Sequence, residues 1–301
     1  MDQASGLRQM IDKKAIHLYK TSKPQKRIKQ RSMEIPQVIT VTSGKGGVGK
    51  TNIVGNLAIA LKRLGKRVLI LDADLGLANI DIIFGLTPKY NINHVINGER
   101  DIADILIKGP EDIYIIPAGS GIQELSQLTE GQKLNLLSEF DAIDDWFDIF
   151  LIDTGAGISS NVIYFNIAAA ERIVLVTPEP TSITDAYALI KVLYTKHGTN
   201  TFKILVNMTK GAEEAESVYK NLSSSVDRFL GNIALDYTGF IPRDNNFQKA
   251  VKKQKAIIQI YPETVSSKSI TKLAEYISKL SRDDPPDGNI KFFWKKLVAS
   301  Y

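Results

Sequence analysis

The sequence predicts an α/β fold with a doubly wound, mostly parallel sheet. Short apolar runs rich in β-branched residues alternate along the chain with segments of helical periodicity. The runs are apolar on both faces, as in strands that helices cover on both sides. This alternation favours parallel strands joined by crossover helices. In such a sheet the ligand lies at the carboxyl ends of the strands, so functional residues are expected there.

Strands and helices are expected to alternate over most of the body of the chain. The strands are expected at Val38–Thr42, Arg67–Leu71, Ile113–Ile116, Ile149–Ile152, Ile173–Val176, Lys203–Val206 and Thr238–Ile241. The helices are expected at Asn52–Leu64, Glu130–Phe140, Asn161–Ala169, Ile183–Lys196, Glu213–Phe229 and Lys268–Leu280.

The composition limits the chemistry that the protein can carry. The 301-residue chain is 44% hydrophobic, enough for a large buried core, and contains no cysteine. Disulfides, cysteine-ligated zinc, iron–sulfur clusters and thiol catalysis are therefore excluded. No apolar run approaches the roughly 20 residues of a membrane span, and the start of the chain lacks the apolar core of a signal peptide. These features are typical of a cytoplasmic protein.

Charge and composition predict three parts: a basic arm over residues 1–35, a body over 36–282, and a linker with a helix over 283–301. Residues 1–32 hold nine basic and two acidic side chains, a net charge of +7, so the remaining chain carries −2 of the total +5. Such an arm can contact nucleic acid, an anionic membrane or an acidic protein, or serve only as a solubilising tail. The prolines and glycine of residues 283–288 end the body because they cannot continue a helix.

A glycine-rich loop joins the first expected strand to the first expected helix. It consists of Gly44, Lys45, Gly46, Gly47, Val48, Gly49, Lys50 and Thr51. Glycines let backbone N–H groups face a phosphate, and the helix N-terminus adds partial positive charge. The spacing predicts that Lys50 reaches the β- and γ-phosphates of a nucleotide and that the Thr51 hydroxyl ligates Mg²⁺. The loop therefore predicts a P-loop NTPase, and the alternative is a glycine-rich turn with chance lysines.

Aspartates follow two of the apolar runs. Asp72 and Asp74 follow the second expected strand, and Asp153 follows the fourth, two residues before Gly155. Strand ends around a P-loop face the nucleotide, so Asp153 is predicted to hold Mg²⁺ and the Gly155 N–H to contact the γ-phosphate as a switch. Capping of the following turn is the alternative for Asp72 and Asp74.

Lys45, the additional lysine inside the loop, makes the sequence KGGVGKT resemble the deviant Walker A motif of the MinD/ParA/nitrogenase-iron-protein family. The resemblance extends over about residues 36–280. It includes the segments Asn79–Asp81, Phe84–Gly85, Ile96–Glu99 and Thr177–Ser182. It implies that Lys45 contacts phosphate across a dimer interface that holds two nucleotides between two subunits. It also implies that Asp74 positions the attacking water and that Asp72 sits near the metal.

The same resemblance implies where the base binds. Asn207 follows the sixth expected strand and would hydrogen-bond adenine, while Pro242 and Arg243 belong to a loop that would lie against the base. A strand-end asparagine is otherwise a common turn residue. The sequence holds no N/T-K-x-D motif for reading guanine, which favours ATP over GTP. ATP and Mg²⁺ are therefore the expected cofactors.

The first residues of the chain resemble the DQAxxLR motif of the flagellar MinD-like ATPases, the FlhG group. The matching residues are Asp2, Gln3, Ala4, Leu7 and Arg8. The resemblance implies a short N-terminal helix that stimulates FlhF, a partner GTPase of the signal-recognition-particle type. It also implies control of the number and placement of flagella, with flagellar basal-body components as further partners. An ordinary unstructured start is the alternative.

The last residues predict an amphipathic helix. One helical stripe consists of Ile290, Phe293, Trp294, Leu297, Val298 and Tyr301. Lysines lie at its edge, which suits a helix at a membrane surface. MinD-type proteins carry such a helix after a linker. Docking of the helix on the body is the alternative.

These observations predict an ATP-hydrolysing switch that is a monomer without ATP and a homodimer with it. The dimer is expected to associate reversibly with the inner face of the cell membrane. Three other functions stay open: a ParA-type DNA-partition ATPase, a MinD-type regulator of the division site, and a metabolic P-loop ligase or kinase. The aromatic C-terminal stripe argues against a nucleic-acid partner, and no signature of an acceptor pocket supports the metabolic enzyme.

Overall fold

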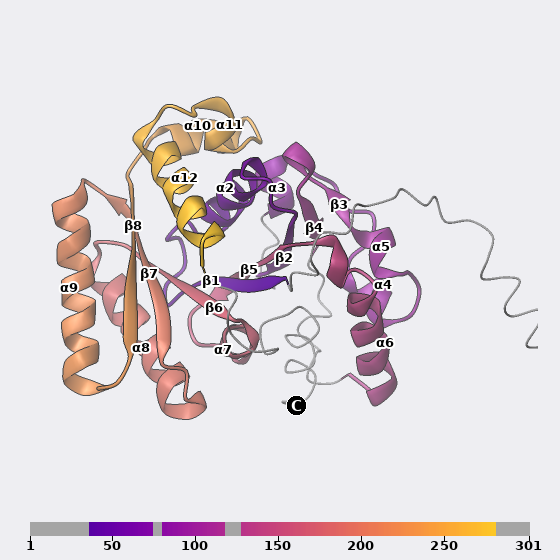
Figure 1. Cartoon of the computed structure of the whole chain (residues 1–301), viewed down its shortest axis with the longest axis horizontal. Coiled ribbons are helices and arrows are strands. Elements are labelled where there is room, and N and C mark those ends of the chain that lie inside the picture. The colour runs from indigo at the N-terminus through magenta and orange to yellow at the C-terminus, as the bar shows by residue number, and fades with distance from the viewer. Residues whose placement is uncertain (1–35, 75–79, 118–127, 281–301) are drawn as a thin grey trace, which may run out of the picture. The chain divides into compact units, whose positions relative to one another are not determined.

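A computed structural model describes the chain over residues 36–74, 80–117 and 128–280 (Figure 1). The basic arm and the amphipathic helix expected from the sequence lie outside the described residues, so both stay predictions. Within the described residues, no helix is long and apolar enough to cross a membrane.

The described residues form one sheet in the order β3-β4-β2-β5-β1-β6-β7-β8. The strands are β1 (Gln37–Ser43), β2 (Val68–Ala73), β3 (Ile107–Lys108), β4 (Tyr114–Ile116), β5 (Ile149–Ala156), β6 (Glu171–Val176), β7 (Thr201–Thr209) and β8 (Ala234–Pro242). Neighbouring strands are parallel except at one edge, where β3 pairs with β4 in antiparallel fashion. The doubly wound, mostly parallel sheet predicted from the sequence is confirmed.

Helices cover both faces of this sheet (Figure 1). They are α2 (Lys50–Arg63), α3 (Ile80–Phe84), α4 (Ile92–Ile96), α5 (Ile102–Ile105), α6 (Glu130–Asp141), α7 (Ser160–Ala168), α8 (Pro180–His197), α9 (Ala212–Phe229), α10 (Asn246–Lys252), α11 (Ile257–Ile260) and α12 (Val265–Ser278). Two 3₁₀ turns are η1 (Pro110–Asp112) and η3 (Asp144–Trp146). The sequence did not predict α3, α4, α5, α10 and α11, which have four to seven residues each.

Strand β1 shows why the central strands are apolar on both faces. Ile39 and Val41 join a buried cluster with α2 and α12, whereas Val38 joins a second cluster that α6 and α7 cover. A third cluster lies between β6, β7 and the helices α8 and α9. Because alternate side chains of a strand point to opposite faces, a strand covered on both sides carries apolar residues on both faces.

Two polar residues of β1 interrupt this apolar pattern. Thr40 Oγ1 donates to Asn166 Oδ1 at 3.1 Å, and Asn166 Nδ2 donates to Thr42 Oγ1 at 3.2 Å. All three side chains are fully buried, so these hydrogen bonds satisfy groups that would otherwise be costly to bury. They fix α7 to the strand that leads into the glycine-rich loop.

Candidate nucleotide site

The glycine-rich loop runs from the carboxyl end of β1 into the first turn of α2. Gly49 has a φ of 92°, in the left-handed region that favours glycine. A Cβ atom at Gly49 would lie 2.8 Å from Asn207 Nδ2, and one at Gly44 would lie 2.1 Å from the Asp185 backbone. The loop therefore packs against α8 on one side and the end of β7 on the other, and glycine is required at both contacts.

Lys50 begins α2, and its side chain is nearly buried at the carboxyl edge of the sheet. The partial positive charge of the α2 N-terminus and this ammonium group make the loop an anion-binding element. The loop thus takes the strand–loop–helix context that the P-loop motif requires.

Asp153 lies on β5, next to the loop, and is fully buried. Neither carboxylate oxygen has a hydrogen-bond partner among the described residues. Burial first, and then the negative charge of the neighbouring Asp72, raise the pKa of Asp153 to about 8, although the Thr51 hydroxyl and the Lys50 charge oppose the rise. A buried carboxylate without a partner, beside a hydroxyl, is a donor set that fits Mg²⁺.

Asp72 lies directly beside Asp153, because the two residues pair in register between β2 and β5. Its environment differs: Asp72 Oδ1 accepts the Asp74 N–H at 3.2 Å, and Asp72 Oδ2 accepts the Ile80 N–H at 3.1 Å. These contacts match the capping alternative for Asp72. Its proximity to a bound metal stays a prediction.

Asp74 and Gly155 come together at the ends of β2 and β5. A Cβ atom at Gly155 would lie 3.6 Å from Asp74 Oδ1. Gly157, which follows β5 with a φ of 91°, donates its N–H to the Ser43 carbonyl at 2.9 Å. The fold therefore gathers the predicted water-positioning carboxylate, the predicted switch glycine and the start of the P-loop at one edge.

Lys45 contacts residues of its own protomer. Its ammonium group forms an ion pair with Glu179 and donates to Thr181 Oγ1 at 3.0 Å. The Ser43 hydroxyl donates to the Lys45 carbonyl at 2.8 Å, which orders the backbone there. The sequence indicated no role for Glu179 or Thr181, since both lie more than 130 residues away from Lys45.

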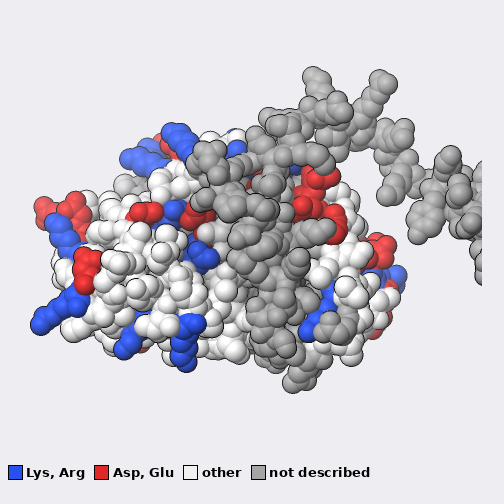
Figure 2. Space-filling model, turned by 60° about the horizontal axis from the view of Figure 1, so that its bottom comes forward, with Lys and Arg blue, Asp and Glu red and all other residues white. Residues whose placement is uncertain are grey.

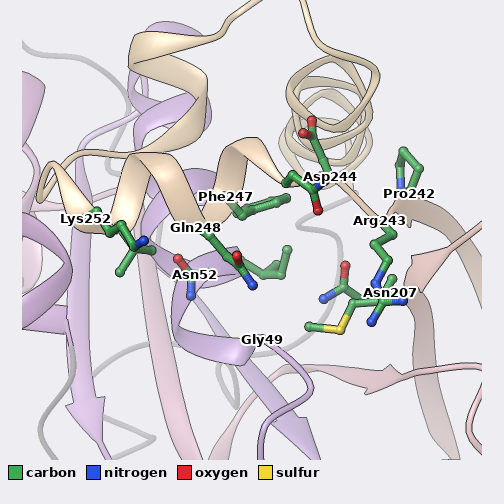
Figure 3. A pocket seen from close by; sticks show the side chains of 13 residues that line it. Gly49, Asn52, Asn207, Pro242, Arg243, Asp244, Phe247, Gln248 and Lys252 are labelled. Atoms are coloured by element: carbon green, nitrogen blue, oxygen red, sulfur yellow. The ribbon is translucent and has the colours of Figure 1, made fainter.

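An open pocket of about 480 Å³ lies beside the loop. Its lining includes Gly49, Asn52, Ile53, Asn207, Met208, Pro242, Arg243, Phe247, Gln248, Val251 and Lys252. Figure 3 shows Asn207 and Arg243 on one side of the pocket and Asn52 and Gln248 on the other. Asn207 is buried, and its Nδ2 donates to the Val48 carbonyl within the loop at 2.8 Å.

The three residues that the resemblance assigned to the base therefore share one pocket with Gly49. Helix α10, which the sequence did not predict, also contributes Phe247, Gln248 and Val251 to the pocket. This helix has only seven residues and gives too little periodicity to be recognised, although its apolar positions 247, 250 and 251 lie on one helical face.

A phosphate-binding loop, an unpartnered buried aspartate on the neighbouring strand and a base-sized pocket at the same sheet edge define a P-loop nucleotide hydrolase. A family model named ParA and described as a NUBPL iron-transfer P-loop NTPase matches residues 34–278. The chain belongs to this family and, by its Lys45-containing loop, to the MinD/ParA ATPases. It has no cysteine and therefore lacks the thiolate ligands of an iron–sulfur cluster.

Two relatives are flagellar proteins by name. The chain is 45% identical over 267 residues to the antiactivator FleN of Pseudomonas aeruginosa. The aligned residues make up 89% of this chain and 95% of FleN. It is 34% identical over 263 residues to the flagellum site-determining protein YlxH of Helicobacter pylori, which covers 86% of this chain and 89% of YlxH.

Solved structures of MinD are similar over most of the chain. The MinC:MinD cell division protein complex of Aquifex aeolicus contains a chain that is 28% identical, with a TM-score of 0.64, covering 83% of this chain and 98% of that one. MinD of Pyrococcus horikoshii, complexed with Mg-ADP, is 23% identical with a TM-score of 0.66, covering 82% and 97%. The second likeness shows the fold alone.

Proposed function

We propose that this protein is a Mg²⁺-dependent ATPase that dimerises with ATP and controls the number or placement of flagella. The similarity to FleN and YlxH supports the flagellar role. The observation that carries the biochemical part is the buried, unpartnered Asp153 next to the P-loop. A cation bound beside the nucleotide phosphates would compensate the buried charge of this carboxylate.

Each residue of the site has a task in this reaction. Lys50 and the backbone N–H groups of the loop bind the phosphates, and Thr51 and Asp153 would hold Mg²⁺, which supplies charge neutralisation. Asp74 orients the attacking water, and the Gly155 N–H contacts the γ-phosphate. Water attacks the γ-phosphate directly, without a covalent intermediate. If turnover is slow, the lifetime of the ATP-bound state would make the protein a timed switch.

Dimerisation follows from Lys45, which would contact phosphate in the partner subunit. The decisive test is size exclusion with light scattering, with and without a non-hydrolysable ATP analogue. The wild-type protein should be a dimer only with the analogue. Lys50→Ala should lose nucleotide binding, whereas Lys45→Ala should keep some binding and stay monomeric. An ATP-dependent dimer of Lys45→Ala would refute the role of Lys45 across the interface.

Membrane association would use the helix at the C-terminus, which lies outside the described residues. Burying one large apolar side chain contributes roughly 1.5–3 kcal/mol. The six side chains of the stripe can therefore anchor a helix at a membrane surface. One helix per monomer would still bind marginally, and pairing two helices in the ATP dimer would raise the avidity. Deletion of residues 288–301 should abolish ATP-dependent co-sedimentation with anionic liposomes. Co-sedimentation that depends on neither ATP nor this segment would contradict the proposal.

The N-terminal arm would act on the partner GTPase FlhF. Its motif is too short for a stable isolated helix, so the helix would form on the partner. A synthetic peptide of residues 1–20 should raise GTP hydrolysis by FlhF, and Gln3→Ala should weaken the effect. If full-length protein stimulates but the peptide does not, the effector lies in the ATPase body.

The second candidate function is DNA partition, which the charge of the basic arm would support. Its charge of +7 would bind DNA phosphates through counterion release. On the face drawn in Figure 2, basic and acidic side chains of the described residues are interspersed rather than gathered into one basic surface. ATP-dependent, salt-sensitive binding to random DNA, without binding to liposomes, would favour this candidate over the flagellar one.

A further inference from the structure

The sulfur atoms of this chain are unevenly distributed. The sequence holds no cysteine and four methionines, at positions 1, 10, 33 and 208, so Met208 carries the one sulfur atom of residues 34–301. The apolar core of the described residues contains no methionine, whereas Met208 is 38% exposed at the end of β7. Methionine usually fills gaps in a core. In this chain the thioether lies at the surface instead, beside the nucleotide pocket.

The backbone of Met208 has a conformation that methionine rarely adopts. Its φ is 61°, in the left-handed region where the Cβ atom crowds the following carbonyl. The register between β7 and β8 shifts between Asn207 and Thr209, so Met208 is the extra residue of a bulge. Both neighbours are buried, and the side chain between them is exposed. Strained residues of this kind concentrate at binding and catalytic sites.

The Met208 side chain lines the pocket beside the glycine-rich loop. A Cβ atom placed on Gly49 would lie 3.5 Å from Met208 Cε, so the methyl group lies against the loop. Asn207, Pro242 and Arg243, the residues assigned to the base, line the same pocket. A thioether is polarisable and packs favourably against aromatic rings, and a purine base is an aromatic ring.

We propose that Met208 packs on the base of the bound nucleotide and that oxidation of its sulfur to the sulfoxide weakens nucleotide binding. The proposal rests on the proposed binding of ATP in this pocket. The oxidant is a peroxide: the O–O bond of hydrogen peroxide breaks, one oxygen atom joins the sulfur, and the other leaves as water. The sulfur is oxidised by two electrons, and no bond of the chain breaks. The product is polar and chiral where the thioether was apolar, so it packs poorly on a base.

The main experiment measures the nucleotide affinity of the full-length protein before and after mild oxidation with hydrogen peroxide. Titration with a fluorescent ATP analogue should show a Kd that rises by about 2- to 10-fold, the range of one sulfur–ring contact. Peptide mass spectrometry gives the fraction of Met208 that is converted. Methionine sulfoxide reductases of both epimer specificities, with a thiol reductant, should restore the original Kd.

Two variants separate the sulfur from its position. Met208→Leu keeps an apolar side chain of similar volume, so it should bind ATP nearly as the wild type does, and peroxide should not change its Kd. Met208→Gln is unbranched and polar like the sulfoxide, so it should weaken binding without any oxidant. The matched control is Met10→Leu/Met33→Leu, which removes two methionines of the basic arm and should stay as sensitive to peroxide as the wild type.

Two further measurements test the contact with the base. Bound ADP should cover the thioether and slow the oxidation of Met208, while the oxidation of Met10 proceeds at an unchanged rate. Inorganic tripolyphosphate has no base, so its affinity, measured by competition with the fluorescent analogue, should be the same before and after oxidation.

The outcomes distinguish two failures. Untreated protein that does not bind ATP overturns the proposed function on which the inference rests. If ATP binds, the inference is overturned by a Kd that stays unchanged with Met208 fully oxidised, by an equal change in Met208→Leu, or by a Met208 that resists peroxide while Met10 is converted. An equal loss of tripolyphosphate affinity also overturns it, because the sulfoxide would then act on the loop and not on the base.

Discussion

Asp72 and Asp153 sit side by side at the ends of neighbouring strands, yet their surroundings differ. Both are buried, and they pair in register between β2 and β5. Asp72 accepts two backbone N–H groups, whereas Asp153 accepts no hydrogen bond from the described residues. Two aspartates at equivalent positions on neighbouring strands therefore differ: Asp72 orders the backbone, whereas Asp153 is available to bind a ligand.

The contrast has an energetic basis. A buried carboxylate that accepts N–H groups is compensated for its loss of water, whereas one without a partner destabilises the fold in its charged form. Residues that break this rule concentrate at functional sites, where a ligand supplies what the protein lacks. The comparison therefore predicts that a change at Asp153 alters the Mg²⁺-dependent activity. A change at Asp72 should instead alter the order of the backbone after β2.

The largest effect is expected for Asp153→Asn. Magnesium-dependent ATP hydrolysis should fall by more than about 10³-fold, because the developing phosphate charge loses its metal. At the same time the ligand-free variant should unfold at a higher temperature than the wild type at pH 7. The two changes together can be measured by a phosphate-release assay and by calorimetry.

The gain in stability should depend on pH in a defined direction. Burial raises the pKa of folded Asp153 to about 8 from the ordinary value of 3.8, so the wild type loses stability relative to Asp153→Asn as the pH rises from about 4 towards 8. The melting-temperature difference between Asp153→Asn and the wild type should therefore grow from pH 5 to pH 8. A difference that shrinks over this range would mean that Asp153 has a partner in solution.

Asp74→Ala tests the next residue along and should have the second largest effect. Its carboxylate lies beside Gly155, and we expect it to orient the attacking water. Turnover should fall by about 10²- to 10³-fold, while ATP binding and ATP-dependent dimerisation persist. Normal turnover would assign the water to another residue. A variant that loses nucleotide binding as well would show that Asp74 supports the site rather than the chemistry.

A smaller effect is expected for Asp72→Asn. The amide oxygen can still accept one N–H, so the end of β2 should loosen but not unfold, and turnover should fall by about 5- to 10-fold, the equivalent of one hydrogen bond. The Mg²⁺ concentration for half-maximal activity should not change. If that concentration rises strongly, Asp72 is a metal ligand as the family resemblance implied, and the contrast with Asp153 is weaker than the structure indicates.

The sequence predicted the regular elements better than the irregular ones. The central strands could be predicted because each is apolar on both faces, as β1 is with Val38, Ile39 and Val41. The strand β3 has two residues, and the helix α4 has five, so neither shows a period. Short elements of this kind are stabilised by tertiary contacts and local caps, such as the Asn91 side chain that accepts the Asn93 N–H.

The candidate site was predictable where one segment carries the chemistry. The loop at residues 44–51 and the aspartates at strand ends are local patterns, and parallel topology brings their ends together. The contact of Lys45 with Glu179 joins residues 134 positions apart, and the missing hydrogen bonds of Asp153 depend on how residues from several strands are placed around it. A pattern in one sequence carries information about residue types, but not about which hydrogen bonds are missing.

The smallest effect is expected at Asn207, which extends the comparison to an uncharged side chain. Asn207 is buried and donates to the Val48 carbonyl, so it connects the P-loop to the base pocket as Asp72 connects β2 to α3.

Asn207→Ala loses about one hydrogen bond, so the affinities for ATP and ADP should fall by the same factor, about 5- to 10-fold. Turnover at saturating ATP should stay within about twofold, because Asp74 and Asp153 are untouched. The preference for ATP over GTP should narrow if the Asn207 amide also reads adenine. Glu216→Gln is the matched control, since Glu216 is exposed on α9 and lies outside the pocket. Fluorescent-nucleotide titrations of both variants would settle the point: an unchanged affinity in Asn207→Ala would confine this residue to a turn, and a large loss of turnover would place it in the reaction itself.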